Sequence, residues 1–136
     1  MAQVRRATLA DHEHIYALWE EARLRTVDLR EWDTLLASPA AIVLVAEEEG
    51  AVEGAIVAAF DGWRAYIYHV AVIPASRRRG VAKQLFAAAH EHLESLGTHI
   101  VYVMVNAEND AGLALLRSMD YASEGDVAMM HELTPR

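Results

Sequence analysis

The part of the sequence best suited to chemistry is a basic turn, Arg77-Arg78-Arg79-Gly80, between an apolar strand-like segment and a long amphipathic helical pattern. The first amides of a helix have no partner within the helix and lie at the positive end of its dipole, so they can bind an anion. Gly80 lets a phosphate approach the backbone closely, because a side chain there would intrude. The Gly-Lys-Ser/Thr element of nucleotide hydrolases is absent. The turn therefore predicts a phosphate-binding site of another kind.

The charges around this turn indicate a small anionic ligand. The net charge is -8, from 12 basic and 20 acidic residues, which argues against general binding to nucleic acid or to an anionic membrane. From Gly62 to His90, however, there are five basic residues and no Asp or Glu, while the rest of the chain has 7 basic against 20 acidic residues. Such a basic island favours one anionic ligand, and the alternative is a solvated turn that binds nothing.

Length and composition set the class of protein. The 136 residues suit a single domain over residues 1–136, and 54% hydrophobic with 24% charged residues is typical of a folded chain. There is no cysteine and no His-Glu-x-x-His pattern, so we predict no metal site. No apolar segment approaches the ~20 residues of a membrane span, and the N-terminal residues lack the apolar stretch of a signal peptide. A cytoplasmic protein without a membrane partner is expected.

Hydrophobic periodicity predicts the elements that position the basic turn. Thr8 and Asp11 have the spacing of a capping box, and Ile15, Leu18 and Trp19 follow at helical spacing. Further helices are predicted at 29–37, 80–96 and 109–119, and strands at 4–7, 41–46, 52–60, 66–73 and 100–105, with one or two closing strands within 121–133. The order β-α-α-β-β-β-α-β-α-β(-β) predicts an α/β fold (α+β by stricter naming), a mixed sheet with helices on both faces.

Three segments of the sequence together resemble the GNAT superfamily of acyl-CoA-dependent N-acetyltransferases. Residues 77–82 (RRRGVA) match its Arg/Gln-x-x-Gly-x-Gly/Ala signature, and residues 70–74 (VAVIP) look like its fourth strand and the following proline. Residues 109–121 resemble its Asn-x-x-Ala…Gly-Phe/Tyr segment, and residues 60–64 (FDGWR) resemble a bacterial branch of small GNAT proteins. The resemblance covers nearly the whole chain in the order of its elements.

The resemblance implies a site for acetyl-CoA as co-substrate. In that family the backbone of the fourth strand pairs with pantetheine, the amides of the basic turn hold the diphosphate, and an asparagine bonds near the pantetheine arm. The strands at 66–73 and 100–105 would splay to form the cleft. The coenzyme-binding residues so implied are Val70, Ala71, Val72, Arg77, Arg78, Arg79, Gly80, Val81, Ala82, Lys83 and Asn109.

The residues that would transfer protons depart from the family pattern. Many members carry a tyrosine general acid where this sequence has Leu116, and leucine cannot donate a proton. Many also carry a basic glutamate at positions that here look like Tyr66 and Met104. A water chain could serve as the base instead.

Tyr68 is the candidate catalytic residue, as a proton donor or a substrate contact. Strand alternation predicts that Tyr66, Tyr68, Val70 and Val72 share one face, with His69 on the other. The alternative is that Tyr68 forms an aromatic wall of the acceptor pocket.

Two tryptophans of the first two helices, Trp19 and Trp32, are predicted to pack in or near the core. The resemblance also leaves open that Trp32 and Asp33 meet the substrate, because this family builds its acceptor pocket from these helices.

The main functional hypothesis is transfer of an acetyl group from acetyl-CoA to a primary amine of a small molecule, amino acid or peptide, by direct attack in a ternary complex. A lysine-like amine has a pKa of ~10.4 and therefore needs a proton acceptor at neutral pH. The alternative is a non-catalytic GNAT-like domain that binds acyl-CoA, motivated by Leu116 and the missing glutamate. RNA binding is disfavoured by the net charge. The resemblance is also compatible with a homodimer.

Overall fold

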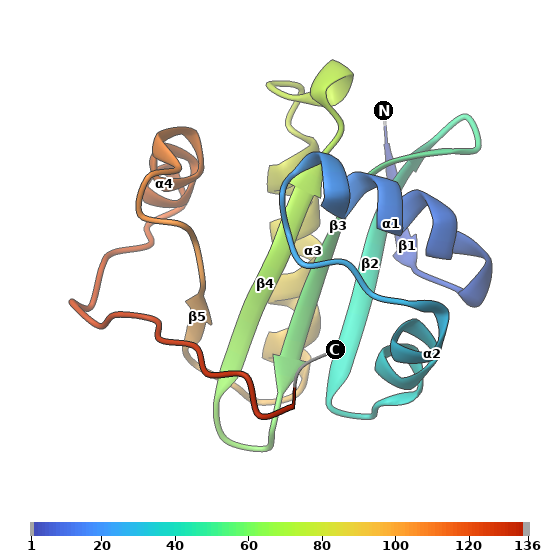
Figure 1. The fold of residues 1–136 in the computed structure, drawn as a ribbon. Helices are drawn as coiled ribbons and strands as arrows, with labels where there is room; N and C mark the ends of the chain where they lie inside the picture. Colours follow the sequence, from blue (N-terminus) through green and yellow to red (C-terminus); the bar gives the residue numbers. More distant parts are fainter. Residues whose placement is uncertain (1, 135–136) are drawn as a thin grey trace. The chain divides into compact units, whose positions relative to one another are not determined.

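The computed structural model describes residues 2–134, which divide into a compact N-terminal unit up to Val103 and a C-terminal unit from Met104. The N-terminal unit contains a five-stranded sheet and three α-helices (Figure 1). Its elements are β1 (Gln3–Arg6), the 3-10 helix η1 (Leu9–Asp11), α1 (His12–Glu21), α2 (Leu29–Ala37), β2 (Ala41–Glu48), β3 (Ala51–Phe60), β4 (Ala65–Val72), the 3-10 helix η2 (Pro74–Ser76), α3 (Val81–Ser95) and β5 (Val101–Val103). The C-terminal unit contains α4 (Asp110–Ser118).

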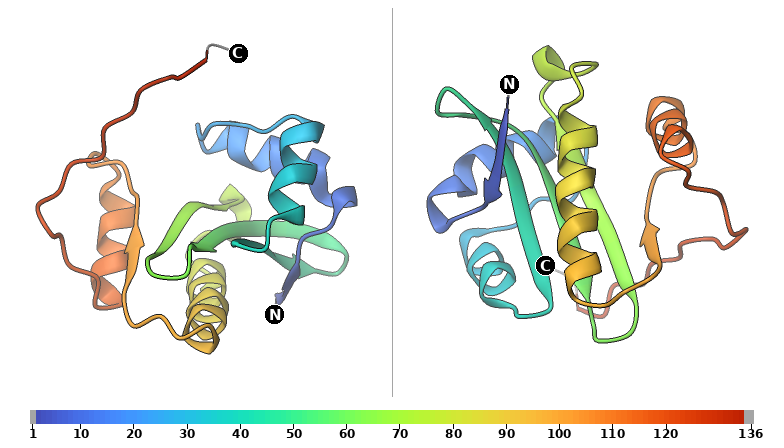
Figure 2. Two further views of the ribbon diagram at one scale, coloured as in Figure 1. Left: turned by 90° about the horizontal axis from the view of Figure 1, so that it is seen from below. Right: turned by 180° about the vertical axis from the view of Figure 1, so that it is seen from behind.

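The sheet has the order β1-β2-β3-β4-β5. Neighbours from β1 to β4 are antiparallel, and β4 pairs with β5 in parallel. Helices α1 and α2 cover one face of this sheet and α3 covers the other (Figure 2). The predicted mixed α/β sheet with helices on both faces is therefore confirmed.

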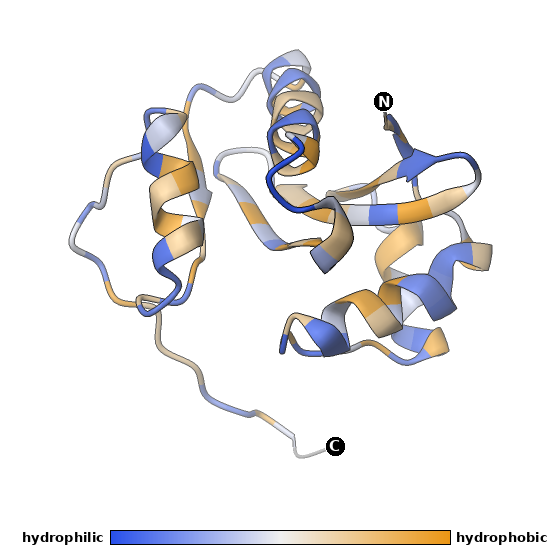
Figure 3. Ribbon diagram, turned by 90° about the horizontal axis from the view of Figure 1, so that it is seen from above, coloured by the Kyte–Doolittle hydropathy of each residue, from blue (hydrophilic) through white to orange (hydrophobic). Residues whose placement is uncertain are grey.

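Side-chain alternation along β2 and β3 provides one apolar surface for each helical layer. On the face of α1 and α2, the buried residues form a cluster of Ile15, Leu18, Trp19, Trp32, Val43, Val45, Ala55, Val57 and Ala71. On the face of α3, a Cβ on Gly54 would lie 3.0 Å from the Ala71 carbonyl oxygen and 3.2 Å from Leu85 Cδ1. Gly54 therefore allows α3 to pack closely on the sheet. Hydrophilic and hydrophobic residues alternate along the helices (Figure 3).

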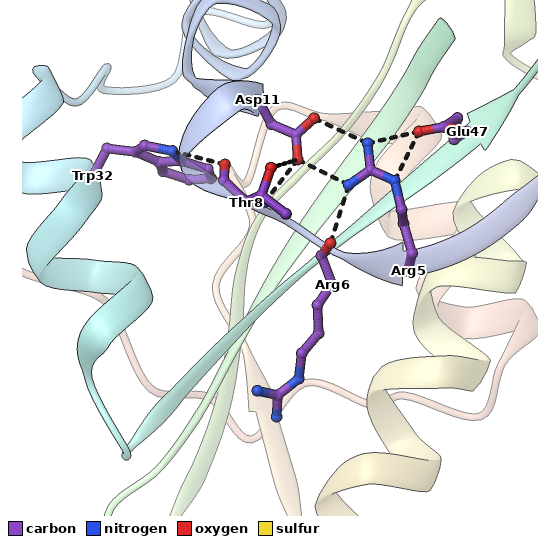
Figure 4. Close-up of polar contacts among 6 residues, drawn as sticks. All are labelled: Arg5, Arg6, Thr8, Asp11, Trp32 and Glu47. Carbon is purple, nitrogen blue, oxygen red and sulfur yellow. Dashed lines mark hydrogen bonds and ion pairs between the residues drawn. The ribbon is translucent and has the colours of Figure 1, made fainter. Parts of the chain in front are cut away.

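A partly buried ion pair holds the start of the first helical layer against the sheet (Figure 4). Arg5 donates to both carboxylate oxygens of Asp11, at 2.9 and 3.0 Å, and its Nε donates to Glu47 at 2.7 Å. The Thr8 amide also donates to Asp11, at 2.8 Å, while Trp32 Nε1 donates to the Thr8 carbonyl at 3.2 Å. The hydrogen bonds from Arg5 hold the pKa of Asp11 below its usual value. This network joins β1, β2, η1 and α2.

The end of the chain departs from the predicted elements. The predicted strand 100–105 is reduced to Val101–Val103, which is half-buried rather than buried, and Met104 is 59% exposed. The closing strands predicted within 121–133 are wrong, because residues 119–134 contain no strand. Alternation of apolar residues makes a strand only where a neighbouring strand accepts its hydrogen bonds. Here the large apolar side chains remain exposed, namely Val127, Met129, Met130 and Leu133.

Candidate functional site

Strand β4 contains a β-bulge that changes which residues share a face. Tyr68 lies opposite Val57 on β3, whereas Ala71 lies opposite Ala55, so β4 has one residue more than β3 in this interval. His69 lies in the bulge and has a left-handed φ of +51°. A non-glycine residue rarely adopts such a φ, so surrounding contacts must hold it there.

Because of the bulge, the side chains of β4 do not alternate between the two faces as predicted. Tyr68 and Ala71 both pack on the face of α1 and α2. The Val72 side chain is on the opposite face, 3.1 Å from where a Cβ on Gly54 would lie. Tyr68 and Val72 therefore do not share a face, and the prediction that they do is wrong.

His69 is also on the face of α1, contrary to the prediction. Its ring meets the ring of Trp19 edge-on, with centroids 4.8 Å apart, and its Nε2 is 2.9 Å from the Arg25 carbonyl oxygen. Burial lowers the pKa of His69, so the neutral imidazole donates from Nε2 to this carbonyl. The bulge thereby anchors the loop between α1 and α2. Sequence reasoning missed this role because an apolar strand with one histidine carries no signature of a bulge.

The edge of β4 that faces β5 is paired over only part of its length. The ladder joins Ala65, Tyr66 and Ile67 to β5 and then stops. From Tyr68 to Val72, no strand pairs with this edge in the part of the chain that the structure describes. Unpaired backbone amides and carbonyls can bind an extended ligand as a further strand would.

The basic turn continues from this edge into α3. Gly80 is the N-cap residue of α3, has a φ of +79° and provides no capping side chain. A Cβ at Gly80 would have no heavy atom within 4 Å, so the space before the helix is open. The turn is coloured as hydrophilic in Figure 3. The first amides of this 15-residue helix are therefore available to an anion.

The three arginines of the turn have different surroundings. Arg77 donates from Nε to the Val72 carbonyl at 3.1 Å and from Nη2 to Glu21 of α1 at 2.9 Å. Its side chain therefore fixes the turn to β4 and α1. Arg79 lies 3.9 Å from Glu48, and Arg78 adopts a left-handed φ of +66°.

A pocket of about 210 Å³ reaches Gly80 and Val81 from the side of β2 and β3. Its lining includes Glu48 and Glu53, and Glu53 accepts a hydrogen bond from the buried Ser76 at 2.9 Å. Glu48 and Glu53 would repel a diphosphate, and Arg79, the basic residue of this lining, already lies 3.9 Å from Glu48, so the pocket suits a diphosphate poorly. An anion fits better on the side of the open β4 edge.

The aromatic candidates have separate roles. Tyr68 is half-buried, burial raises its pKa, and its hydroxyl has no hydrogen-bond partner among residues 2–134. It is therefore protonated at neutral pH and able to donate. Trp32 is fully buried, which confirms that it packs in the core, whereas Asp33 is exposed.

The C-terminal unit contains Asn109, the remaining predicted coenzyme-binding residue, together with Leu116 and Tyr121 of the family-like segment 109–121. Leu116 is buried in α4 and offers no proton, while Tyr121 donates its amide to the Leu116 carbonyl at 3.0 Å and has a pKa raised by burial to about 12. Asn109 caps α4, because its Oδ1 accepts from the Gly112 amide at 2.9 Å. A Cβ on Gly112 would lie 2.5 Å from Asn109 Nδ2, so a larger residue there would require the Asn109 side chain to shift.

Residues 2–134 contain neither a membrane-spanning helix nor a cluster of metal ligands. No helix there is long and apolar enough to cross a membrane. No group of three or more His, Cys, Asp or Glu side chains in these residues is arranged to hold a metal ion.

Comparison with known proteins agrees with this geometry. Residues 4–121 match the model of the acetyltransferase (GNAT) family. The acetyltransferase SG1711 of Sodalis glossinidius is 30% identical over 127 residues, which cover 88% of this chain and 87% of that protein. A solved transcriptional regulator from Bacillus halodurans superposes with a TM-score of 0.86 at 19% identity, covering 97% of this chain and all of that one. The aminoglycoside N-acetyltransferase AAC(6')-Iy, solved in complex with CoA, has a TM-score of 0.84 at 19% identity over 98% of this chain and 96% of its own. With an unpaired strand edge leading into an open helix start, and with a family match along nearly its whole length, this chain belongs to the acetyltransferase (GNAT) family.

Proposed function

We propose that this protein transfers an acetyl group from acetyl-CoA to a primary amine of a small molecule, amino acid or peptide, by direct attack in a ternary complex. The observation that carries this proposal is that the unpaired edge of β4 is followed, after η2 and the basic turn, by Gly80 and the first amides of α3. An extended pantetheine arm followed by a diphosphate needs these two features in this order. The solved relative in complex with CoA supports the same co-substrate.

The residues present fit the coenzyme. The backbone of Val70, Ala71 and Val72 would pair with the pantetheine arm, with the Val72 carbonyl already held by Arg77. Open space at Gly80 would admit the diphosphate. One helix N-terminus stabilises an anion by up to ~2 kcal/mol, so several amides and nearby cations must act together. We assign the binding of the diphosphate to Arg78, Arg79, Gly80, Val81, Ala82 and Lys83. Arg77 instead fixes the turn to β4 and α1 through its bonds to Val72 and Glu21. The implied contact of Asn109 with pantetheine stays a prediction.

Acetyl-CoA would supply the acetyl group as a thioester. The amine nitrogen attacks the carbonyl carbon, the C–N bond forms, the C–S bond breaks and the thiolate leaves with a proton. Unpaired amides of β4 near the bulge would stabilise the oxyanion. Tyr68 would donate the proton to the thiolate, because a tyrosine hydroxyl is protonated at neutral pH and burial raises the pKa of Tyr68 further. Water would accept the proton from the amine.

Replacing Tyr68 with phenylalanine is expected to lower kcat by about 10-fold while the KM for acetyl-CoA changes less than about twofold. General acid catalysis typically contributes at least ~100-fold, and water near an open strand edge would replace part of that. Steady-state kinetics with acetyl-CoA and an amine measures the effect. Tyr16→Phe, on the exposed side of α1, is the control. An unchanged kcat would show that Tyr68 is only a wall of the pocket.

A non-catalytic domain that binds acyl-CoA is the second candidate, favoured by the buried, apolar Leu116 at the position of the usual acid. Released CoA, measured with a thiol reagent against a panel of amines, separates the two functions. Turnover with any amine supports the enzyme. Tight binding of acetyl-CoA by calorimetry without turnover would favour the second candidate.

We also propose that both units work as one acetyltransferase domain over residues 1–136, because the family match continues through them to residue 121. A cytoplasmic location and a homodimer remain predictions, the latter to be checked by light scattering.

A further inference from the structure

A guanidinium group lies among aromatic rings at the start of β4. The Arg64 guanidinium carbon is 5.0 Å from the ring centroid of Trp63 and 5.8 Å from that of Tyr102 on β5. The rings of Tyr66 and Tyr102 are 5.7 Å apart, and a hydrogen bond with Tyr66 raises the pKa of Arg64. Stacking on aromatic faces orients the guanidinium plane and leaves its edge free to donate hydrogen bonds.

The charge of Asp61 acts on this guanidinium and helps to raise its pKa, but no carboxylate forms an ion pair with it among residues 2–134. The nearest acid in sequence, Asp61, uses Oδ1 to accept from the amides of Trp63 and Arg64, at 2.8 Å each. All of β4 also lies in the acid-free segment from Gly62 to His90. Arg64 is therefore an exposed cation that aromatic rings orient, and the N–H groups that do not bond Tyr66 can bind a carboxylate.

This cation lies on the acceptor side of the proposed reaction. The diphosphate site is at the Gly80 end of β4, and the unpaired edge runs back from Val72 to Tyr68. A pantetheine arm along that edge would bring the thioester toward Tyr68, next to where pairing with β5 begins. Tyr66 follows on the same face as Tyr68, because the bulge comes only after Tyr68. An amine that reaches the thioester would therefore lie over Tyr66 and Tyr102, with Arg64 beyond them.

We propose that the acceptor carries a carboxylate besides its amine, as an amino acid or short peptide does, and that Arg64 binds this carboxylate. The inference rests on the proposed function, because the position of the thioester follows from the proposed binding of acetyl-CoA along β4. A planar guanidinium fits a carboxylate through two parallel hydrogen bonds. Arg64 is exposed, so its selectivity for a carboxylate rests on this two-bond geometry and on the rings that orient it.

The same charges act against a polycationic acceptor. The solved relative AAC(6')-Iy is named for aminoglycosides, which carry several amines. Carboxylates are the groups that bind such ammonium ions, and β4, β5 and the turn before β4 provide only Asp61, whose Oδ1 is already engaged by two amides. Arg64 would in addition repel a second ammonium group.

The test compares amines that differ only in the carboxylate. Initial rates of CoA release are measured for 6-aminohexanoate against 6-aminohexanamide, whose amines have nearly the same pKa, and for shorter pairs such as β-alanine and its amide. The wild-type protein is expected to have a kcat/KM at least about 10-fold higher for the best carboxylate than for its amide. Arg64→Gln should reduce this ratio to within about twofold by lowering only the carboxylate's rate, and Arg64→Lys should retain part of it because it keeps the charge without the fork.

Controls separate this inference from the function on which it rests. Arg64 is exposed, so Arg64→Gln should keep the wild-type melting temperature and Kd for acetyl-CoA. Arg6→Gln, on the strand at the other edge of the sheet, should keep the preference for the carboxylate. Transfer that favours the amides, or spermidine or sisomicin, would overturn the inference and leave the acetyltransferase proposal intact. Binding of acetyl-CoA without transfer to any amine would overturn both.

Discussion

Replacing Gly80 with aspartate is expected to weaken the binding of acetyl-CoA by at least about 30-fold, the equivalent of ~2 kcal/mol. Gly80 is the N-cap of α3, with open space where a side chain would extend. An aspartate there would bring a negative charge to the helix amides and accept their hydrogen bonds itself. It would compete with the diphosphate for the same donors. Isothermal titration calorimetry with acetyl-CoA measures the change.

The matched control for this variant is Gly97→Asp. Gly97 follows the other end of α3, also has a positive φ (+93°) and also has open space around the position of a Cβ. Both substitutions therefore add one negative charge and a left-handed strain of ~1–2 kcal/mol, but only one is near the proposed diphosphate site. Gly97→Asp should leave the Kd within about twofold of wild type. Equal Kd values for Gly80→Asp and wild type would contradict the coenzyme site.

Replacing Asp11 with asparagine is expected to lower the free energy of unfolding at pH 7 by about 2 kcal/mol. The Asp11 side chain is 7% exposed, and its carboxylate accepts from Arg5 and from the Thr8 amide. Breaking a fully buried ion pair costs ~3–5 kcal/mol, and the effect is smaller here because the Arg5 side chain is 36% exposed. Urea denaturation monitored by tryptophan fluorescence measures the difference. Glu47→Gln, which removes the more exposed partner of Arg5, should cost less than ~1 kcal/mol.

The contribution of Asp11 should also depend on pH in a defined direction. Its pKa is lowered in the folded state, chiefly by hydrogen bonds from Arg5. The stabilisation is therefore complete above the unfolded-state pKa of ~3.9 and is lost as the pH falls through the lower pKa of the folded state. The difference in unfolding free energy between wild type and Asp11→Asn should shrink steadily below about pH 4. A difference that stays constant down to pH 2.5 would exclude this ion pair as its cause.

Local sequence patterns were sufficient for most of the N-terminal unit. Helix α2 has the predicted bounds Leu29–Ala37, because Asp28 and Glu31 form a capping box and Ser38-Pro39 ends it. Helix α3 begins after Gly80 for the same kind of reason, since only glycine adopts its left-handed φ without strain. These signals involve residues within one turn of each other, so they can be read without knowing the fold.

Features that depend on distant partners were predicted less well. The bulge at His69 is held by Trp19 and the Arg25 carbonyl, which are far from it in sequence, so strand alternation placed Val72 on the wrong face. The segment after Tyr121 has strand-like residues but no strand to pair with in the described chain, and the predicted closing strands are absent.

What the sequence alone determined is therefore the α/β order of elements and the basic turn with Gly80 at a helix start, because spacing, caps and periodicity act over a few residues. The tertiary structure alone decided which strand edge is left unpaired, that Arg77 is tied to Glu21, and that Arg64 rests on Trp63 and Tyr102 without an ion pair to an acid among the residues described. Each of these features depends on contacts between segments that only folding brings together. Such contacts produce no periodic pattern of residues in the sequence.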